Sequence, residues 1–449
     1  MQTLGPTDAG YDDARQLFNR MIDRRPAVIA RCESPADVAE ALALARTREL
    51  DVAVRSGGHS VSGLSTNDGG LVVDVRPMDR VEVDPDRRTM RVGAGANWGQ
   101  IDAATQAHGL AVTGGRATST GVAGYTLGGG DGWLARTFGL ACDNLLAVDL
   151  VTASGREVRA SETENSELFW ALHGGGGNFG VATAFEFRLH PLGPEILCGL
   201  AAWPLDGADG ADGAAAVDVA RAYRDLMPDA PEALGGGIMV TSGDDTVPVE
   251  FQGRSLLLVI VCYAGDPDEG RELLAPVLTP EPPPLDYVAV QPYTQLQQDL
   301  TDPPGYHHYW SADYHDRFED DALDVFLRAA AERPSPLVQQ VLFPWGGAIA
   351  HLADGETPLS HRQTPWVTHP FAVWERPEDT EANIAWVRRF RSDIAPFTSG
   401  GVYLNYIGGE GRDRVRAAFG DETYARLQQV KAEYDPDNVL RGNQNIRPA

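Results

Sequence analysis

Apolar positions in the first part of the chain alternate between short continuous runs and helical spacing. Ser34 followed by Pro35 predicts the start of a helix over residues 36–47, because serine caps helices and proline fits their first turn. Strands and hairpins are predicted over 27–30, 71–75, 81–95 and 145–161. This alternation of strand and helix predicts a mixed α/β region over residues 27–192.

The pattern changes after residue 193. Longer apolar runs at 255–265 and 336–350, with an amphipathic stretch at 320–332, predict an antiparallel sheet covered by helices on one face. The Gly- and Asp-rich segment 205–216 predicts a flexible joint. We therefore predict an α+β fold with four parts: an N-terminal helical segment 1–24, a first domain 25–193, a second domain 194–400 and a C-terminal segment 401–449.

The charge balance excludes several classes of partner. Lys+Arg 37 against Asp+Glu 64 gives a net charge of -27, which argues against nucleic acid and anionic membrane surfaces. No apolar run reaches about 18 residues, so no membrane span is predicted and we expect a cytoplasmic protein. The 4 cysteines lack metal-ligand spacing, which predicts reduced, buried thiols and no metal site.

The stretch RSGGHS, residues 55–60, follows the predicted strand end Val52–Val54. Its two glycines allow a tight turn and a close approach of the backbone to a ligand. Exposed amides together with Arg55 suit a phosphate group. Phosphate binding does not explain His59, and a single histidine does not make a metal site.

Two glycine-rich stretches follow. Residues 175–180 fit the pattern GxGxxG, but a predicted helix precedes them and a predicted strand follows. A dinucleotide-binding fingerprint needs the opposite order, so we reject that interpretation. The stretch 118–145 indicates either a backbone that closely approaches a flat ligand or a plain glycine-rich connection.

Three stretches occur together in a characteristic order: RSGGHS, TGVAGYTLGGGDGW with GLACDN, and YLNY with YDPDNVLRGNQNI. In this combination the chain resembles the FAD-linked oxidases of the vanillyl-alcohol oxidase superfamily, in the berberine-bridge-enzyme-like branch, over nearly its whole length. The resemblance implies a PCMH-type FAD-binding domain of two α/β subdomains over 25–193. It also implies a substrate-binding α+β domain over 194–400, and a segment 401–449 that returns to the FAD domain.

The resemblance implies that His59 is bonded covalently to the 8α-methyl group of FAD. Many relatives carry a second tether, a cysteine at the position that Ala117 occupies here, whereas Cys142 belongs to another motif. We therefore predict one covalent bond, as in bacterial members of the 6-hydroxy-D-nicotine oxidase type. The other residues that the resemblance places around FAD are Arg55, Ser56, Gly57, Gly58, Ser60, Thr118, Gly121, Gly124, Tyr125, Asp131, Gly180, Val181, Asn443 and Asn445.

The resemblance also implies catalytic residues. Tyr406, the second tyrosine of YxNY, matches the base of relatives that oxidise alcohols or phenols, with Tyr403 and Asn405 beside the flavin. An ordinary tyrosine has a pKa of about 10, so this role needs a neighbouring cation or strong hydrogen bonds. The alternative, that Tyr406 only packs against the substrate, stays open. Thr120 matches the position that controls access of dioxygen, and its small size leaves room.

The substrate domain supplies His308, Trp310, Gln339 and Trp374 as candidate substrate contacts. They predict a wide aromatic and polar cleft for a small organic substrate without identifying it. The function implied is removal of hydride from a C–H next to oxygen or nitrogen, with dioxygen reduced to hydrogen peroxide. The alternatives are a flavin N-oxide type of monooxygenase and a flavoprotein relative without catalytic activity.

Overall fold

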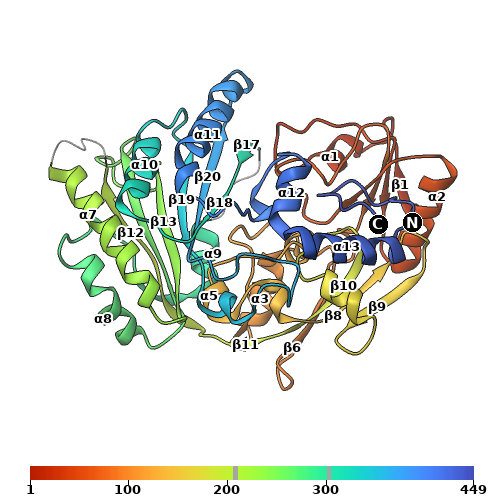
Figure 1. Ribbon diagram of the computed structural model, residues 1–449, viewed down its shortest axis with the longest axis horizontal. Coiled ribbons are helices and arrows are strands. Elements are labelled where there is room, and N and C mark those ends of the chain that lie inside the picture. The colour runs from red at the N-terminus through yellow and green to blue at the C-terminus, as the bar shows by residue number, and fades with distance from the viewer. Residues whose placement is uncertain (206–210, 301–304) are drawn as a thin grey trace.

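Two lobes lie side by side, and the chain returns to the first lobe at its end (Figure 1). This computed structural model describes residues 1–205, 211–300 and 305–449. Residues 206–210 of the predicted joint 205–216 lie outside the described part. Both termini lie in the first lobe, and the C-terminal part of the chain crosses back to this lobe from the second.

The first lobe begins with a small sheet in which three strands run parallel. Helix α2 (Pro35–Thr47) starts as predicted, with the Ser34 side chain accepting a hydrogen bond from the Asp37 amide. Residues 1–24 contribute an antiparallel edge strand as well as the short helix α1 (Tyr11–Arg15). In spatial order the strands are β1 (Gln2–Leu4), β2 (Val28–Arg31), β4 (Leu71–Asp74) and β3 (Val52–Arg55).

A second sheet of 5 antiparallel strands completes the first lobe. The predicted hairpins 81–95 and 145–161 form its two edges. Asn97 starts α3 (Trp98–Gln106) with a capping box, in which its side chain accepts from the Gln100 amide at 3.0 Å. In spatial order the strands are β5 (Val81–Asp84), β6 (Thr89–Gly93), β10 (Val181–Arg188), β8 (Leu145–Val151) and β9 (Glu157–Ser161).

Shorter elements connect these sheets and the second lobe. They are β7 (Leu110–Ala111), α4 (Val122–Leu127), α5 (Ala135–Phe138), the 3-10 helix Ala141–Asn144, α6 (Ser166–Ala171), β11 (His190–Pro191) and α9 (Tyr293–Asp299).

The second lobe is built on one antiparallel sheet, ordered β15-β12-β14-β13-β19-β20-β17, with β16 beside β12 and β18 beside β20. Its strands are β12 (Glu195–Pro204), β13 (Leu234–Ser242), β14 (Ser255–Tyr263), β15 (Leu285–Asp286), β16 (Ala289–Pro292), β17 (His307–Trp310), β18 (Asp313–His315), β19 (Gln339–Pro344) and β20 (Trp366–Trp374).

Side chains of this sheet alternate between two different surroundings. Leu257 and Val259 pack in one apolar cluster with the covering helices, whereas Leu258 and Ile260 point to the opposite face. The covering helices are α7 (Ala211–Leu226), α8 (Pro267–Leu278), α10 (Asp320–Ala331) and α11 (Thr380–Ile394). The predicted antiparallel sheet with helices on one face is confirmed, and its other face is turned toward the first lobe.

The C-terminal segment returns through α12 (Arg412–Phe419) and α13 (Asp421–Tyr434), which pack on the first lobe (Figure 1). Lys431, the single lysine of the chain, is fully buried on α13. Its ammonium group donates to Asp435 at 2.6 Å and to the carbonyls of Asn178 and Leu440 at 2.7 and 3.1 Å. This one cation therefore ties the tail to the glycine-rich turn before β10.

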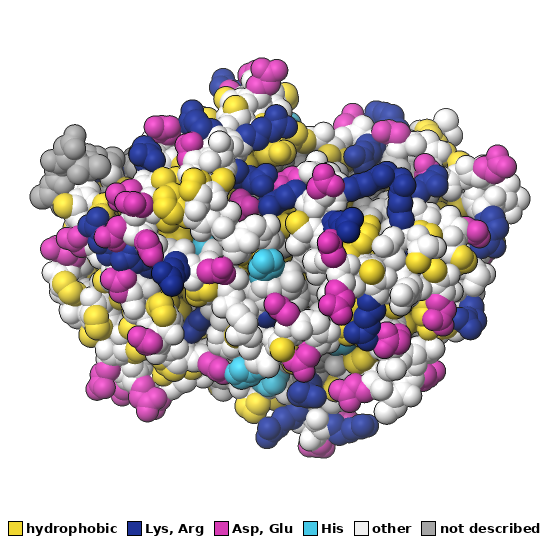
Figure 2. Space-filling view, viewed as in Figure 1, with side chains coloured by type: hydrophobic (Ala, Val, Ile, Leu, Met, Phe, Trp, Pro, Cys, Tyr) yellow, Lys and Arg dark blue, Asp and Glu magenta, His cyan; other side chains and the backbone are white. Residues whose placement is uncertain are grey.

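Acidic and basic side chains are interspersed over the face seen in Figure 2, in keeping with the many arginine–carboxylate pairs of the surface. No helix within the described ranges is long and apolar enough to cross a membrane.

Candidate active site

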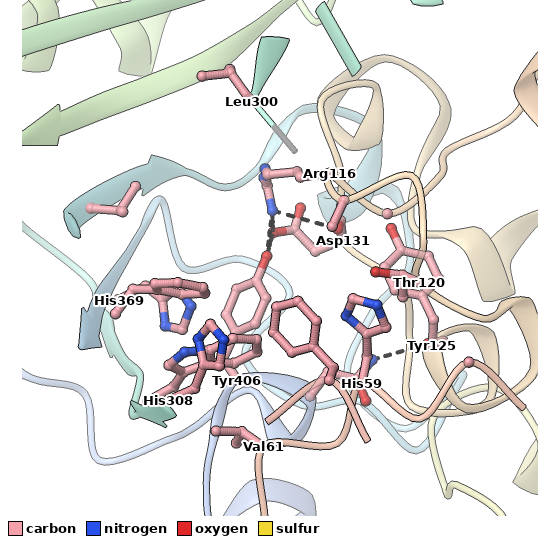
Figure 3. Close-up of a pocket in the computed structure, with 18 of the residues that line it drawn as sticks. His59, Val61, Arg116, Thr120, Tyr125, Asp131, Leu300, His308, His369 and Tyr406 are labelled. Atoms are coloured by element: carbon pink, nitrogen blue, oxygen red, sulfur yellow. Dashed lines mark hydrogen bonds and ion pairs between the residues drawn. The ribbon is translucent and has the colours of Figure 1, made fainter. Parts of the chain in front are cut away.

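A cavity of about 1660 Å³ separates the open face of the second-lobe sheet from the first lobe. Drug-sized ligands occupy pockets of roughly 300–1,000 Å³, so this cavity has room for two molecules side by side. Its wall on the first lobe is mostly loop backbone, and its wall on the second lobe is lined by side chains of the sheet, from β12, β13 and β14 as well as from β17, β19 and β20. Figure 3 shows the part of the cavity around His59 and Tyr406.

Two glycine-containing loops touch at the first-lobe wall. A Cβ on Gly57 would lie 2.2 Å from the Gly121 nitrogen, and a Cβ on Gly121 would lie 2.1 Å from the Gly57 nitrogen. Any side chain at either position would force the two backbones apart. Gly58 adopts φ +80°, which turns the chain after β3. These requirements explain the glycines of RSGGHS.

Arg55 does not take the place predicted for it at a phosphate group. Its guanidinium points away from the cavity and donates to the backbone carbonyls of Ala14 and Gln16. Arg55 is the last residue of β3, and because Val52 and Val54 line the cavity, the alternation along the strand directs Arg55 to the opposite side. This arginine holds the N-terminal segment against the loop, and the prediction is corrected accordingly.

His59 lies in the cavity wall, with its ring stacked on Phe18 at 4.2 Å between centroids. Its Nε2 is 2.9 Å from the Ser119 hydroxyl. Burial lowers the pKa of His59 to about 4, so the imidazole is neutral near pH 7. A neutral ring keeps a lone pair, which is what bond formation to an electrophilic carbon requires.

The tail crosses the cavity beside the glycine-rich turn 174–177. Asn443 donates to the carbonyls of Gly177 and Leu440, both at 3.0 Å, and its side-chain oxygen is buried with no partner among the described residues. A Cβ on Gly177 or Gly124 would meet no atom of the described residues within 4 Å. Bare backbone therefore faces open space on this side of the cavity.

The remaining residues predicted for the first-lobe wall divide into two groups. Those that line the cavity are Ser56, Gly57, Gly58, Ser60, Gly121, Gly124, Tyr125, Asp131, Gly180 and Asn443, together with Thr120 and Asn405. Those that do not are Thr118, Val181, Asn445 and Tyr403. Tyr403 lies behind the wall, where its hydroxyl accepts from the Gly130 amide at 2.6 Å and from Asn405 at 3.1 Å.

His308, Trp310 and Gln339 line the second-lobe wall as predicted, but Trp374 does not. In β17 and β20, His308 pairs with Val373 and Trp310 pairs with Phe371, so the odd-numbered residues of β20 face the cavity. Trp374 faces the helices, where it packs with Trp386 and donates to Thr380. The cavity residues of β20 are His369, Phe371 and Val373.

Tyr406 meets two charged side chains where the walls join (Figure 3). Its hydroxyl donates to Asp131 Oδ2 at 2.6 Å and accepts from Arg116 Nη1. Arg116 also donates to Asp131 Oδ2 at 2.8 Å. The guanidinium lies 3.8 Å from the ring centre of Phe343 and 4.6 Å from that of Trp133.

The electrostatics of this group follow from its burial. Burial raises the pKa of Tyr406 well above its ordinary value, the Arg116 charge opposes that rise, and the Asp131 charge adds to it. Burial works against the Arg116 charge, but its interactions with Asp131 and with the phenols of Tyr406 and Tyr125 together outweigh burial, so the pKa of Arg116 is raised. Near neutral pH Arg116 is therefore a charged guanidinium and Tyr406 a neutral phenol.

Two parts of the chain match known families. Residues 26–161 match the FAD binding domain, and residues 402–447 match the family described as berberine and berberine like. An uncharacterized FAD-linked oxidoreductase of Bacillus subtilis is 30% identical over 456 residues, which cover 98% of this chain and 97% of the relative. The chain belongs to the FAD-linked oxidoreductases.

This FAD-linked oxidoreductase is also similar to two proteins of the 6-hydroxynicotine oxidase type. The (R)-6-hydroxynicotine oxidase of Paenarthrobacter nicotinovorans is 29% identical over 460 residues, covering 100% of this chain and 96% of the relative. The crystal structure of 6-hydroxy-D-nicotine oxidase from Arthrobacter nicotinovorans matches with a TM-score of 0.89 and 27% identity, covering 100% and 98% of the two chains. The predicted PCMH-type fold and the berberine-bridge-like resemblance are confirmed.

The first-lobe wall fits FAD. Gly57, Gly121, Gly124 and Gly177 present backbone without side chains along the cavity, as an extended cofactor with a pyrophosphate requires. Tyr125 carries a buried hydroxyl without a partner in the described chain, as Asn443 carries a buried oxygen. Such buried polar atoms indicate a missing hydrogen-bonding group.

Two residues that the sequence analysis missed complete the site, Ser119 beside His59 and Arg116 beside Asp131. His369 also lies there, stacked on Tyr406 at 4.3 Å. Arg116 and Asp131 carried a usable signal. Both are charged residues within an otherwise apolar and glycine-rich stretch, and buried charges in proteins are paired. Ser119 carried no such signal, because only its contact with His59 in the folded protein connects it to the site.

Proposed function

We propose that this FAD-linked oxidoreductase is an oxidase that holds FAD through one covalent bond to His59. It removes hydride from a carbon next to oxygen or nitrogen of a small organic substrate and passes the electrons to dioxygen, which gives hydrogen peroxide. FAD, when bound, supplies the hydride-accepting ring. The observation that carries the proposal is the Tyr406 hydroxyl, held between a carboxylate and a guanidinium on the cavity that His59 also lines.

His59 attaches and positions the cofactor in this proposal. Its neutral imidazole is held by Ser119 on one edge and by Phe18 on one face, so the ring orientation is fixed. Ala117 lies where many relatives carry a second, cysteine tether, which supports a single covalent bond.

The second-lobe wall positions the substrate. Trp310 and Phe371 stack on each other at 4.2 Å between ring centroids and form an aromatic surface, with His308 beside them. Burial lowers the pKa of His308 to about 3 and that of His369 to about 3, so both rings are neutral. The wall therefore suits a neutral aromatic or apolar substrate, and Tyr406 supplies its polar contact.

Thr120 controls the approach of dioxygen in this proposal. It lines the cavity directly before Gly121, and its side chain is small. Replacing Thr120 with leucine would fill the space through which dioxygen reaches the ring.

All 4 cysteines are free and buried, which supports a cytoplasmic location.

The test is an anaerobic screen of candidate alcohols, phenols and amines against the purified FAD-loaded protein. A substrate bleaches the visible absorbance of the flavin without oxygen, and the absorbance returns in air as peroxide forms. Slow return in air would contradict the oxidase proposal, and labelled oxygen in the product would indicate the monooxygenase alternative instead.

The covalent bond is tested separately by mass spectrometry of tryptic peptides. We expect the flavin on the peptide that contains His59 and expect it to remain on the denatured chain. A flavin adduct on Cys142 would contradict the single-tether proposal, whereas full release on denaturation would show that the cofactor is not covalently held.

A further inference from the structure

Tyr406 is not built to act alone as a base. Its pKa lies well above the ordinary value, so the phenol is protonated near neutral pH. A protonated phenol can accept a proton from the substrate only if it passes its own proton to another group. A base needs a final acceptor for the proton, and the structure holds a carboxylate at the phenol oxygen.

We propose that Tyr406 relays the substrate proton to Asp131, which is the final acceptor, while Arg116 holds both groups in place. This inference rests on the proposed function, because it assumes that Tyr406 contacts the substrate. As the substrate O–H or N–H proton moves to Tyr406 Oη, the phenol proton moves to Asp131 Oδ2.

The hydrogen-bond directions leave only one arrangement for the phenol. A tyrosine hydroxyl has one donor and two acceptor sites. Arg116 can only donate, so one acceptor site of Tyr406 is used by Arg116 and the single donor points to Asp131 at 2.6 Å. One acceptor site remains, and Tyr406 lines the cavity, so this site is available to a substrate hydroxyl or amine.

Packing fixes the relay geometry. The Asp131 side chain is 3% exposed and its backbone amide donates to the Tyr403 hydroxyl at 3.1 Å. Arg116 is held between the rings of Trp133 and Phe343. The step from Tyr406 to Asp131 therefore follows one fixed, short hydrogen bond, which is the geometry that proton transfer in general-base catalysis requires.

The other titratable groups around Tyr406 do not compete as acceptors. His369 stacks on Tyr406 with 19° between the ring planes, so its nitrogen lone pairs do not point at the phenol, and its Nδ1 bonds the Ser311 carbonyl at 2.8 Å. The phenols of Tyr403 and Tyr125 have pKa values raised by burial and keep their protons. Asp131 is therefore the acceptor among the groups at Tyr406.

The step balances. The substrate O–H or N–H bond and the Tyr406 O–H bond break, and new O–H bonds form on Tyr406 and Asp131. Proton transfer oxidises nothing, since both electrons leave the substrate carbon with the hydride that FAD accepts. When dioxygen is then reduced to hydrogen peroxide, one added proton is consumed, and Asp131 supplies it through the same path.

The main test is Asp131→Asn in the full-length, FAD-loaded protein. Without the carboxylate charge, Arg116 is the main charge at the phenol, so the pKa of Tyr406 falls. We expect anaerobic flavin reduction to slow about a hundred-fold or more near neutral pH and to recover as the pH rises. Ultraviolet absorbance should show a new tyrosinate titration over the same pH range, and Tyr406→Phe in the same background should remove it.

Asp102→Asn is the matched control. Asp102 is a second buried carboxylate, which accepts from Gln297 at 2.9 Å and does not line the cavity. We expect this variant to reduce flavin at the wild-type rate without a new tyrosinate titration. If Asp131→Asn reduces flavin at the wild-type rate and with the wild-type pH profile, the relay is overturned. If Tyr406→Phe reduces flavin slowly in the same experiment, the proposed function still stands.

A measurement on wild-type protein covers the case in which Asp131→Asn does not fold. The ultraviolet spectrum of wild type minus that of Tyr406→Phe should show a neutral phenol at position 406 around pH 7. A tyrosinate at that pH would overturn the relay, because the phenol would then be the final acceptor. Asp131→Glu, which keeps a carboxylate, should reduce flavin faster than Asp131→Asn.

Discussion

The two walls of the cavity are built by different means. On the first lobe, backbone faces the cavity and the tight approach of Gly57 and Gly121 excludes side chains. On the second lobe, side chains of neighbouring strands make the surface, and their direction follows from the strand register. A glycine wall tolerates little change, whereas a side-chain wall can change its shape one residue at a time.

This difference separates general from specific tasks. The backbone wall suits an extended cofactor, and the side-chain wall suits recognition of a particular substrate. Tyr406 lies where the two walls meet, and it is the residue through which substrate chemistry and cofactor chemistry connect in the proposed function. Substitutions on each wall should therefore fail in different ways.

The largest effect is expected at the junction. Tyr406→Phe removes one oxygen and almost no volume, so the flavin spectrum and occupancy should stay as in wild type. Loss of a general base costs roughly a hundred- to ten-thousand-fold in rate. Stopped-flow absorbance under anaerobic conditions measures it, and reduction at the wild-type rate would place the base elsewhere, with His308 as the next candidate.

Substitutions on the backbone wall should reduce FAD binding. In Gly57→Ala the new Cβ would lie 2.2 Å from the Gly121 nitrogen, so the loops must separate. We expect a destabilisation of about 1–3 kcal/mol together with reduced FAD content. Gly409→Ala is the control, since a Cβ there meets nothing within 4 Å. Flavin absorbance per chain and thermal unfolding measure both, and equal FAD content in the two variants would contradict the close-approach argument.

Substitutions on the side-chain wall should weaken substrate binding without changing the FAD content. Phe371→Leu removes one ring of the stacked pair with Trp310, and we expect the substrate KM to rise about ten-fold or more with unchanged FAD content. Trp374→Phe, three residues away on the helix-facing side, should lower the melting temperature without changing KM. A KM effect from Trp374→Phe would contradict the strand register.

The smallest effect concerns the contact between the lobes. Burial raises the pKa of Asp102 from 3.8 to about 7, despite the hydrogen bond from Gln297 that opposes it. Between these two pH values the folded protein holds a proton that the unfolded chain has released, so this carboxyl lowers stability as the pH rises from 3.8 to about 7. The melting temperature of Asp102→Asn should fall less over this range than that of wild type.

Sequence reasoning worked where a feature depends on neighbours along the chain. The capped helices at Ser34 and Asn97 and the hairpins follow from local turn and capping chemistry, and the structure confirms them. The role of the glycines around His59 could also be predicted, because glycine at a strand end allows a tight turn and a close approach of two backbones. The order of helix and strand around 175–180 correctly excluded a dinucleotide fingerprint.

It failed where a feature depends on distant contacts. Arg55 was assigned to a phosphate because it adjoins the glycines, yet its guanidinium donates to the backbone carbonyls of Ala14 and Gln16. Trp374 was assigned to the cavity by its aromatic character, although the pairing of β17 with β20 decides its direction. The Tyr406 group joins residues 290 and 275 positions apart, and no local pattern contains that information.

Lys431 gives the protein a built-in chemical reporter. A chain with a single lysine offers amine-reactive reagents one side chain, and here that side chain is fully buried. Acylation of Lys431 therefore requires α13 and the tail to come away from the glycine turn, since the folded tail covers the amine. The rate of acylation of Lys431 therefore reports how often the tail detaches from the first lobe. Bound FAD should lower this rate, and the more strongly FAD stabilises the attached tail, the lower the rate should be.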